Sequence, residues 1–269
     1  MDNNTFYKGL GAAYRSQDMQ AIETYLESSL AEVKEEKPLN ESLLCMIYNE
    51  MGSFYRGTSR YERSLEAFGQ AAALLKRLKG EKNGEYAALT NNTAGTYRLM
   101  GDYDRAIAMY KKAFAIYEEL GDTESYPYAS VHNNISQAYQ ATGELDLALV
   151  HMEKALPLIE KLPKHAHEVA VSYMNLGAIY YRMNRFAEAH DCADKAMAIC
   201  ESLDEKKIVH YAAALNLKGH LFYREGKYDE ALTYYEKSAD YTKRFFGENV
   251  EYKSACENIE RTRRKLSGM

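Results

Sequence analysis

Asparagine side chains return at a fixed interval inside stretches with helical spacing of apolar residues. They stand two or three positions before a small residue that recurs every 41 or 42 residues. The set is Asn49, Asn91, Asn92, Asn133, Asn134, Asn175 and Asn216. Asn is only a middling helix former, so its regular return needs a reason. A side-chain amide donates and accepts hydrogen bonds at once, which suits the backbone of an extended peptide. The alternative is that these amides bond neighbouring repeats or face water.

Arginine forms a second series, about one helical turn further along each stretch. Its members are Arg15, Arg56 and Arg98, then Arg182 and Arg224 one position later. A guanidinium group offers a planar fork of donors that matches a carboxylate or a phosphate. Cations are also favoured in the last turn of a helix by the helix dipole, whether or not a ligand binds. Both interpretations remain open for this series.

The remaining reactive side chains do not assemble into a catalytic or metal-binding set. His165 and His167 stand in a predicted loop without a third ligand nearby, so metal binding is not expected. Cys192 and Cys200 are eight residues apart on one predicted helix, more than about 10 Å along its axis, which is too far for a disulfide. The chain has no Gly-rich phosphate loop and no Ser/His/Asp arrangement of a nucleophile elbow. We therefore predict no enzymatic activity, no cofactor and no bound metal.

The elements that position the Asn and Arg series are internal repeats. The recurring small residues are Gly52, Ala94, Ser136, Gly177 and Gly219. An aromatic residue follows three positions later, and a second series of small residues follows after twelve: Ser64, Ala106, Ala148, Ala189 and Ala231. A period of this length indicates stacked supersecondary units rather than one closed core. Stacked repeats build long binding surfaces, which makes binding a better expectation than catalysis.

Each repeat is predicted to consist of two amphipathic helices. In the second full repeat the helices span 86–100 and 103–120, and each is followed by a glycine that can adopt a left-handed cap, Gly101 or Gly121. The period places repeats at 44–85, 86–127, 128–168, 169–210 and 211–251. Residues 1–43 read as a degenerate repeat and 252–266 as a lone capping helix, so 1–269 is predicted to be a single solenoid.

Two runs of sequence, 91–106 and 219–231, resemble tetratricopeptide repeats. The longer period is similar to that of kinesin light chains and of bacterial peptide-pheromone receptors. The resemblance covers 44–251 strongly and the two ends weakly. It implies an all-α, right-handed superhelical solenoid of about six helix-turn-helix repeats. In this family the first helices line a concave groove that holds peptides or partner proteins.

The resemblance places both polar series in that groove. The expected ligand-binding residues are the seven Asn residues above, together with Arg56, Arg98, Gln137, Arg182, His220 and Arg224. Counting Lys8 and all five Arg residues against Glu50, this face carries +5, whereas the whole chain carries −5. A positive face on an acidic protein concentrates anionic ligands. The expected ligand is therefore an extended, acidic segment.

Composition and charge limit the expected partners and the expected cellular location. The net charge of −5 argues against a general nucleic-acid binder, and no long uncharged apolar stretch predicts a membrane span. Neither a signal peptide nor a close cysteine pair is visible, so we expect a cytoplasmic protein with reduced thiols. The sequence predicts a non-enzymatic scaffold for a peptide or protein segment. The alternative is a regulatory peptide receptor whose ligand changes the superhelix pitch and so controls a partner.

Overall fold

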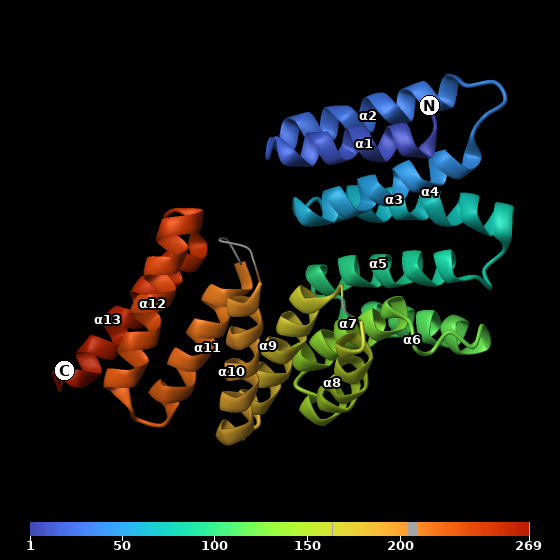
Figure 1. Ribbon diagram of the computed structural model, residues 1–269. Coiled ribbons are helices and arrows are strands. Elements are labelled where there is room, and N and C mark those ends of the chain that lie inside the picture. The colour runs from blue at the N-terminus through green and yellow to red at the C-terminus, as the bar shows by residue number, and fades with distance from the viewer. Residues whose placement is uncertain (163, 204–208, 269) are drawn as a thin grey trace. The chain divides into compact units, whose positions relative to one another are not determined.

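The computed structural model describes residues 1–162, 164–203 and 209–268, and within these ranges it holds thirteen α-helices and no strand (Figure 1). The first seven helices are α1 (Asn3–Arg15), α2 (Met19–Glu35), α3 (Glu41–Gly57), α4 (Tyr61–Lys79), α5 (Gly84–Met100), α6 (Tyr103–Glu119) and α7 (Tyr126–Thr142). The other six are α8 (Leu145–Glu160), α9 (Ala166–Arg182), α10 (Phe186–Ser202), α11 (Val209–Arg224), α12 (Tyr228–Phe246) and α13 (Val250–Leu266). The predicted all-α solenoid of helix pairs is confirmed.

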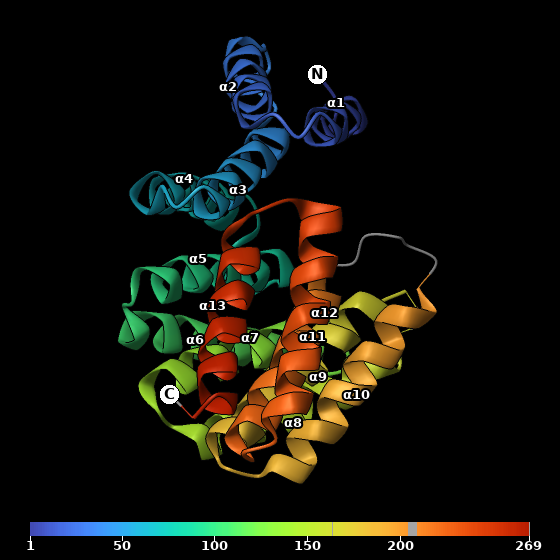
Figure 2. The same ribbon diagram turned by 90° about the vertical axis from the view of Figure 1, so that its left-hand side faces the viewer.

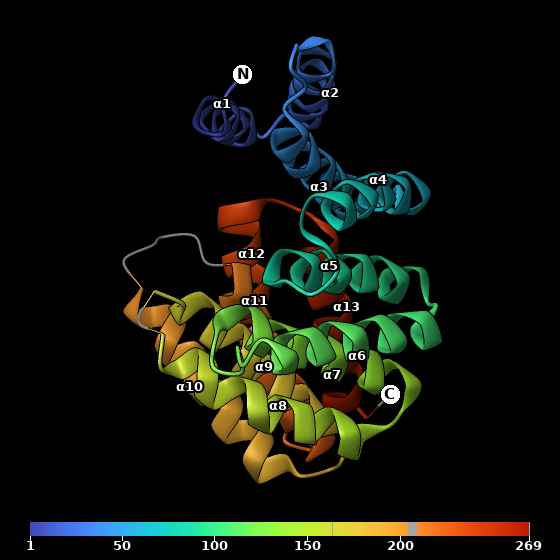
Figure 3. The same cartoon turned by 90° about the vertical axis from the view of Figure 1, so that its right-hand side faces the viewer.

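Contacts between helices divide the chain into two compact units, Met1–Ala138 and Tyr139–Met269. In the first unit each helix from α1 to α6 packs on the next, and α5 and α6 form a clear pair (Figure 3). In the second unit the same sequential packing runs from α8 to α13, where α13 lies beside α12 (Figure 2). Consecutive packing of this kind is the signature of a repeat protein, in which each helix pair is buried by its neighbours.

The recurring small residues lie where two helices of one pair approach closely. A Cβ atom on Gly52 would come within 2.5 Å of the Phe68 ring, and one on Gly219 within 2.6 Å of the Tyr235 ring. The second series of small residues lies on the other helix of each pair, and Ala106 of this series is fully buried in α6, the partner helix of α5. Its counterpart Ser64 in α4 is equally buried, and its hydroxyl donates to the Gly52 carbonyl at 2.8 Å. Small side chains therefore set the spacing within each pair, and the one hydroxyl in this position of the first unit is satisfied.

Turns within the helix pairs use a residue with left-handed backbone, seven positions after the small residue. Gly101 occupies this place with a φ of 83°, and Ser59 does so with a φ of 58°. Asn184 takes the same place in the second unit with a φ of 60°. A residue without a Cβ is favoured in this conformation. The turn geometry is therefore common to the repeats even where glycine is replaced.

Several sequence expectations can be compared directly with the helices. The helices expected at 86–100 and 103–120 are α5 and α6, and the expected capping helix is α13. The boundaries of the individual repeats stay a prediction. Residues 163 and 204–208, which belong to the repeats expected at 128–168 and 169–210, lie outside the described residues.

Two further expectations concern the cysteines and the membrane. Cys45, Cys192 and Cys200 are buried free thiols, and Cys256 is a half-buried one. Burial raises the pKa of Cys192 to about 12, so this thiol resists ionisation. Among the described residues, no helix is both long and apolar enough to cross a bilayer.

Candidate functional site

Asparagines from successive repeats pair with one another. The Asn92 amide donates to the Asn49 Oδ1 at 3.3 Å, and the Asn134 amide donates to the Asn91 Oδ1 at 3.1 Å. In the second unit, Asn258 donates to the Asn216 Oδ1 at 3.4 Å. In the two pairs of the first unit, the accepting residue stands three positions before the small residue of its repeat. The donating residue stands two positions before the small residue of the next repeat. The inter-repeat role, one of the two interpretations of this series, is therefore present in the free protein.

This pairing rule also explains where the series is interrupted. Met174 stands at the accepting register position of its repeat, and Leu217 stands at the donating position of the next. At this junction both amides are missing together, and both positions are apolar. Asn258 in α13 was not among the predicted residues, although it follows Asn216 by 42 positions and the period alone points to it.

Pairing leaves part of each amide available. An amide group has two N–H donors and an oxygen with two lone pairs, and one inter-repeat bond uses a single donor or lone pair. Asn49 and Asn92 both line a pocket of about 190 Å³, together with Met46 and Ala88. The pocket is formed by α1, α3, α4 and α5 of the first unit. These two amides therefore combine an inter-repeat bond with a place on a pocket wall.

The other predicted asparagines lie in comparable surroundings. Asn216 lines a pocket of about 360 Å³ in the second unit, near the start of α13. Asn91 is almost buried, with 9 % of its surface exposed. Asn133 on α7 and Asn175 on α9 are half-buried, as is Gln137 on α7. His220 on α11 accepts or donates through Nδ1 to the Tyr235 hydroxyl at 2.8 Å, and burial lowers the pKa of its imidazole.

Most members of the arginine series reach a neighbouring repeat. Arg56 Nη1 donates to the Asn92 backbone carbonyl at 2.9 Å, and Arg182 Nη1 donates to the Gln140 carbonyl. Arg224 Nη2 donates to the Asn184 Oδ1 at 2.9 Å. Among the ion pairs of the described residues, none includes any of these three or Arg98. Their positive charges therefore lack a carboxylate counterion within the part of the chain that the structure describes.

Arg98 differs from the rest of the series. Its Nε is buried, as is the hydroxyl of Tyr110 on the neighbouring helix α6. Burial raises the pKa of Tyr110, and the Arg98 side chain opposes this shift through its charge and a hydrogen bond. The two buried polar groups are therefore neighbours that interact with each other.

Acidic side chains also lie near the asparagines, and Glu85 lines the pocket that Asn49 and Asn92 share. Glu50 accepts from the Tyr7 hydroxyl at 3.4 Å and from the Asn49 amide at 3.5 Å. Burial raises the pKa of this carboxyl, and these two weak hydrogen bonds oppose the shift.

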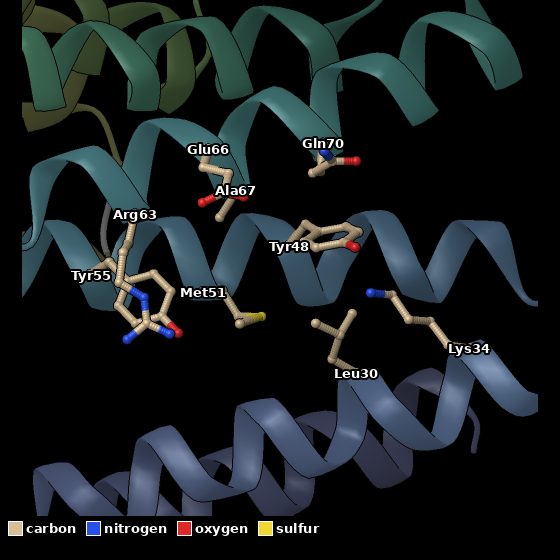
Figure 4. Close-up of a pocket in the computed structure, with 9 residues that line it drawn as sticks. All are labelled: Leu30, Lys34, Tyr48, Met51, Tyr55, Arg63, Glu66, Ala67 and Gln70. Carbon is tan, nitrogen blue, oxygen red and sulfur yellow. The ribbon is translucent and has the colours of Figure 1, made fainter.

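A second pocket of the first unit, of about 440 Å³, contains none of the predicted residues (Figure 4). It lies among α2, α3 and α4, and Tyr48, Met51 and Tyr55 of α3 point into it. The spacing of these three residues puts them on one stripe of the helix. The 190 Å³ pocket is lined instead by Cys45, Met46 and Asn49 of α3, so the two pockets use different stripes of this helix.

Sequence reasoning missed one polar cluster in the second unit. Lys218 is only 6 % exposed, and its Nζ lies 2.7 Å from the Asp194 carboxylate and 3.1 Å from His190 Nδ1. His190 Nε2 lies 3.3 Å from Glu225. Burial, helped by the charge of Lys218, lowers the pKa of His190. The signal was visible, because Lys218 stands at a register position where other repeats carry Met51, Thr93, Ile135 and Leu176.

The expectation that both His165 and His167 lie in a loop is wrong for His167, because His165 is the N-cap of α9 and His167 lies in the first turn of this helix. His165 Nδ1 lies 3.5 Å from the Glu168 carboxylate. In the described ranges, no three His, Cys, Asp or Glu side chains are grouped as metal ligands.

Known structures with a similar fold are solenoids of helix pairs. BtubC (BKLC) from P. vanneervenii aligns with a TM-score of 0.64 and 23 % identity, over 74 % of this chain and 80 % of that one. A Rap protein complexed with competence and sporulation factor aligns with a TM-score of 0.63 and 20 % identity, over 98 % and 87 % of the two chains. The apo form of RapI gives 0.65 and 17 %, over 99 % of each. At these identities the likeness establishes the fold alone.

Sequence comparison identifies the family directly. No curated protein matches the chain significantly. A family model described as tetratricopeptide repeat matches residues 43–119 and 127–202, and a second with the same description matches 212–244. Together these matches cover more than half of the chain and most of every helix from α3 to α12. The chain belongs to the tetratricopeptide repeat family.

Proposed function

We propose that this protein is a non-enzymatic scaffold that binds an extended, acidic peptide or protein segment on the face formed by the first helices of its repeats. Membership of the tetratricopeptide repeat family supports the binding role. The observation that carries the proposal is the placement of Asn49 and Asn92 on the wall of one pocket. Their inter-repeat hydrogen bond uses only one donor of Asn92 and one lone pair of Asn49, which leaves hydrogen-bonding capacity on both amides. A peptide backbone needs alternating donors and acceptors, and these amides supply both.

The arginine series supports the acidic character of the ligand. Arg56 and Arg98 belong to the same unit as this pocket, and neither is in an ion pair with a described carboxylate. The net charge of the protein is −5, but a local cluster of cations still attracts anionic segments to its own surface. Guanidinium groups also orient carboxylates through paired hydrogen bonds.

An array of synthetic peptides of equal length tests the proposal. Half of the peptides carry Asp or Glu at alternating positions, and the other half carry Asn or Gln there. Acidic peptides are expected to bind more tightly, and Asn92→Ala is expected to weaken their binding by roughly tenfold, the effect of losing one hydrogen bond to a buried ligand group. Gln70→Ala is the matched control, because it truncates an amide that lines the other pocket (Figure 4). Equal affinity of both peptide sets, or equal loss in both variants, would contradict the proposal.

A regulatory peptide receptor is the second candidate. The observation that favours it is the alignment over 98 % of this chain with the Rap protein that was solved in complex with competence and sporulation factor. In this version, peptide binding changes the pitch of the solenoid and so controls a partner. Small-angle scattering with and without the best acidic peptide would measure the change. An unchanged scattering curve at saturation would leave the scaffold role and exclude the receptor role.

We infer a cytoplasmic location for either role. The four cysteines are free thiols, three of them buried, as in proteins of a reducing compartment. Labelling of the thiols in intact cells with a membrane-impermeant reagent tests this inference. Protection until lysis is expected, and labelling of Cys256 before lysis would overturn it.

A further inference from the structure

A chain of polar side chains connects helices α10 and α11, which belong to successive repeats of the second unit (Figure 1). The Lys218 ammonium lies 2.7 Å from the Asp194 carboxylate and 3.1 Å from His190 Nδ1. The other ring nitrogen of His190, Nε2, lies 3.3 Å from the Glu225 carboxylate. Lys218 is buried and His190 is half-buried, so water cannot readily replace these contacts.

These contacts determine the protonation state of the imidazole. An ammonium group has three donors and no acceptor, so Nδ1 of His190 can only accept from Lys218. The proton of the neutral ring is therefore on Nε2, which donates to Glu225. Protonation of Nδ1 would remove the acceptor and place the charged ring beside the ammonium. The arrangement requires a neutral His190.

Polar side chains are exceptional at these two register positions. In three other repeats, the position of His190 holds Leu65, Ile107 and Leu149, and the position of Lys218 in the helix that follows holds Thr93, Ile135 and Leu176. A buried ion pair seldom stabilises a protein more than well-packed apolar residues of similar volume. A departure from the repeat pattern that brings no gain in packing indicates a functional role.

The charged groups around His190 come from three parts of the second unit. Asp194 lies on the same helix, Lys218 on α11, and Glu225 in the turn between α11 and α12. Glu225 is also paired with Lys227 at 2.8 Å. Burial and the charge of Lys218 lower the pKa of His190, and Glu225 and Asp194 oppose this shift.

Helix α9 packs on α10 as well, and two of its tyrosines face other charges of that helix pair. The Arg185 guanidinium lies 4.5 Å from the centre of the Tyr180 ring, and the Lys195 ammonium lies 5.4 Å from the centre of the Tyr173 ring. Both phenols have a raised pKa because they are buried, so they stay neutral while histidine titrates.

We propose that His190 and Lys218 form an acid-sensitive joint between the repeat of α9 and α10 and the repeat of α11 and α12. Near neutral pH the neutral ring accepts from Lys218 and holds α11 to α10. Protonation of His190 breaks this hydrogen bond, and repulsion between the two cations loosens the joint. This device does not depend on the proposed peptide-binding role. Acidification thereby changes how firmly two repeats are connected.

The direction of the pH dependence follows from the two states of the ring. Because the folded protein lowers the pKa of His190, the unfolded chain takes up the proton first, near the usual histidine value of about 6.5. Above that pH the joint contributes its full stability. As the pH falls through the usual value and then the lowered folded value, this contribution is lost. The pKa of Glu225 is lowered from the usual glutamate range, so its loss follows only at more acidic pH.

Nitrogen-15 nuclear magnetic resonance of the full chain tests the protonation state. At pH 7.5, His190 is expected to carry a proton on Nε2 alone. Lys218→Met copies Met51, and Asp194 tolerates the loss of its partner because its side chain is 60 % exposed. This variant removes the ammonium and leaves Glu225, so the titration midpoint of His190 should rise by about one pH unit or more. The other histidines are internal controls. A proton on Nδ1 at pH 7.5, or an unchanged midpoint in Lys218→Met, would overturn the proposal.

Amide hydrogen exchange of the full chain measures the joint itself. After correction for the intrinsic pH dependence of exchange, we expect amides of α10 and α11 to lose roughly five- to tenfold in protection between pH 7.5 and pH 5.5. Amides of α5 and α6 in the first unit are expected to keep theirs. Equal changes in both pairs of helices would overturn the proposal.

Two variants remove the titrating group without removing the connection. The double variant His190→Leu and Lys218→Leu copies Leu149 and Leu176. His190→Asn keeps an oxygen that accepts from Lys218 but does not titrate. Both variants are expected to keep the protection of α10 and α11 at pH 5.5.

Lys195→Gln is the matched control, because it breaks an exposed ion pair with Asp191 on the same helix. It should lose protection on acidification as the wild type does. Loss of protection in His190→Asn, or its absence in Lys195→Gln, would contradict the role of His190. If the double variant does not fold, His190→Asn alone decides the outcome.

Discussion

Each asparagine of the inter-repeat pairs has two tasks that a single substitution can separate. Asn91 is almost buried, and its Oδ1 accepts from Asn134 at 3.1 Å. Removing the donor leaves a buried acceptor without a partner, which costs about 1–3 kcal/mol. We therefore expect Asn134→Ala to lower the free energy of unfolding of the free protein by about that amount in urea titration. Gln70→Ala, at an exposed position of α4, should change it by less than about 0.5 kcal/mol. Equal stabilities of the two variants would show that the pairing contributes nothing to stability.

Glu50 gives this face a pH dependence. Burial raises the pKa of its carboxyl in the folded protein, so folding favours the protonated form. Below the usual pKa of a glutamate the group is protonated in both states and stability is unaffected. As the pH rises through the usual value and then the raised folded value, ionisation costs stability, and the cost is complete above the latter.

Glu50→Gln is therefore expected to raise the melting temperature at pH 7 and to have no such effect at pH 4. Glutamine resembles the protonated acid in shape and carries no charge to desolvate. Melting curves of both proteins across this pH range measure the difference. A gain of the same size at both pH values would contradict a titrating Glu50.

Tight turns are the element in which the repeats differ most in residue type while sharing one backbone shape. Gly101 and Ser59 occupy the same turn position with positive φ angles of 83° and 58°. A non-glycine residue in this conformation costs about 1 kcal/mol. Gly101→Ala is expected to destabilise the protein by about 1 kcal/mol, and Ser59→Gly to stabilise it by up to a similar amount. Denaturant titration of both variants checks the two signs, and shifts of the same sign would mean that the turn does not impose this backbone.

Packing within a helix pair depends on side chains that are no larger than a methyl group. Ala106 in α6 is fully buried, whereas Glu119 near the end of the same helix is exposed. Ala106→Leu is expected to destabilise the protein by about 1–3 kcal/mol through overpacking. Glu119→Leu is the surface control, with an expected change below about 0.5 kcal/mol. Thermal shifts of equal size in the two variants would show that the register of small residues is wrong.

Helices and turns were predictable from the sequence because each depends on local spacing. The helices α5 and α6 follow from apolar residues three or four apart and from Gly101 and Gly121, and the structure gives nearly the same bounds. The partner of an individual side chain depends on how far one repeat is offset from the next. That offset joins Asn49 to Asn92, 43 residues away, rather than to Asn91 at the same register position. The register positions of these asparagines were therefore predictable, and their hydrogen bonds were not.

Two polar residues, Lys218 and Tyr110, show what the repeat pattern of the sequence can and cannot predict. Lys218 breaks a register of mostly apolar residues, so a closer reading of the repeat would have found its cluster with Asp194. Tyr110 takes a position that other repeats fill with Phe68 or Met152, and it reads as ordinary core. Its interaction with the Arg98 side chain becomes apparent only when the burial and neighbours of its hydroxyl are known.

On the scale of the whole molecule, an acidic chain carries a periodic series of cations in the last turns of α3, α5, α9 and α11. The net charge is −5, yet Arg56, Arg98, Arg182 and Arg224 have no ion pair among the described residues. Exposed charges are screened over about 8 Å at physiological ionic strength. Binding of acidic segments should therefore weaken as salt is added, and binding of neutral segments should not. The two-unit architecture leaves each unit with its own asparagine pair and pocket, at Asn49 in one and Asn216 in the other.

The most direct test is a crystal structure of the protein with the tightest acidic peptide from the array. The account predicts a peptide backbone within hydrogen-bond distance of the Asn49 and Asn92 amides, in the pocket that Met46 and Ala88 also line. It also predicts that an acidic side chain or terminus of the peptide lies near Arg98. A peptide seated instead in the pocket of Tyr48, Met51 and Tyr55 (Figure 4), with Asn49 and Asn92 untouched, would contradict it.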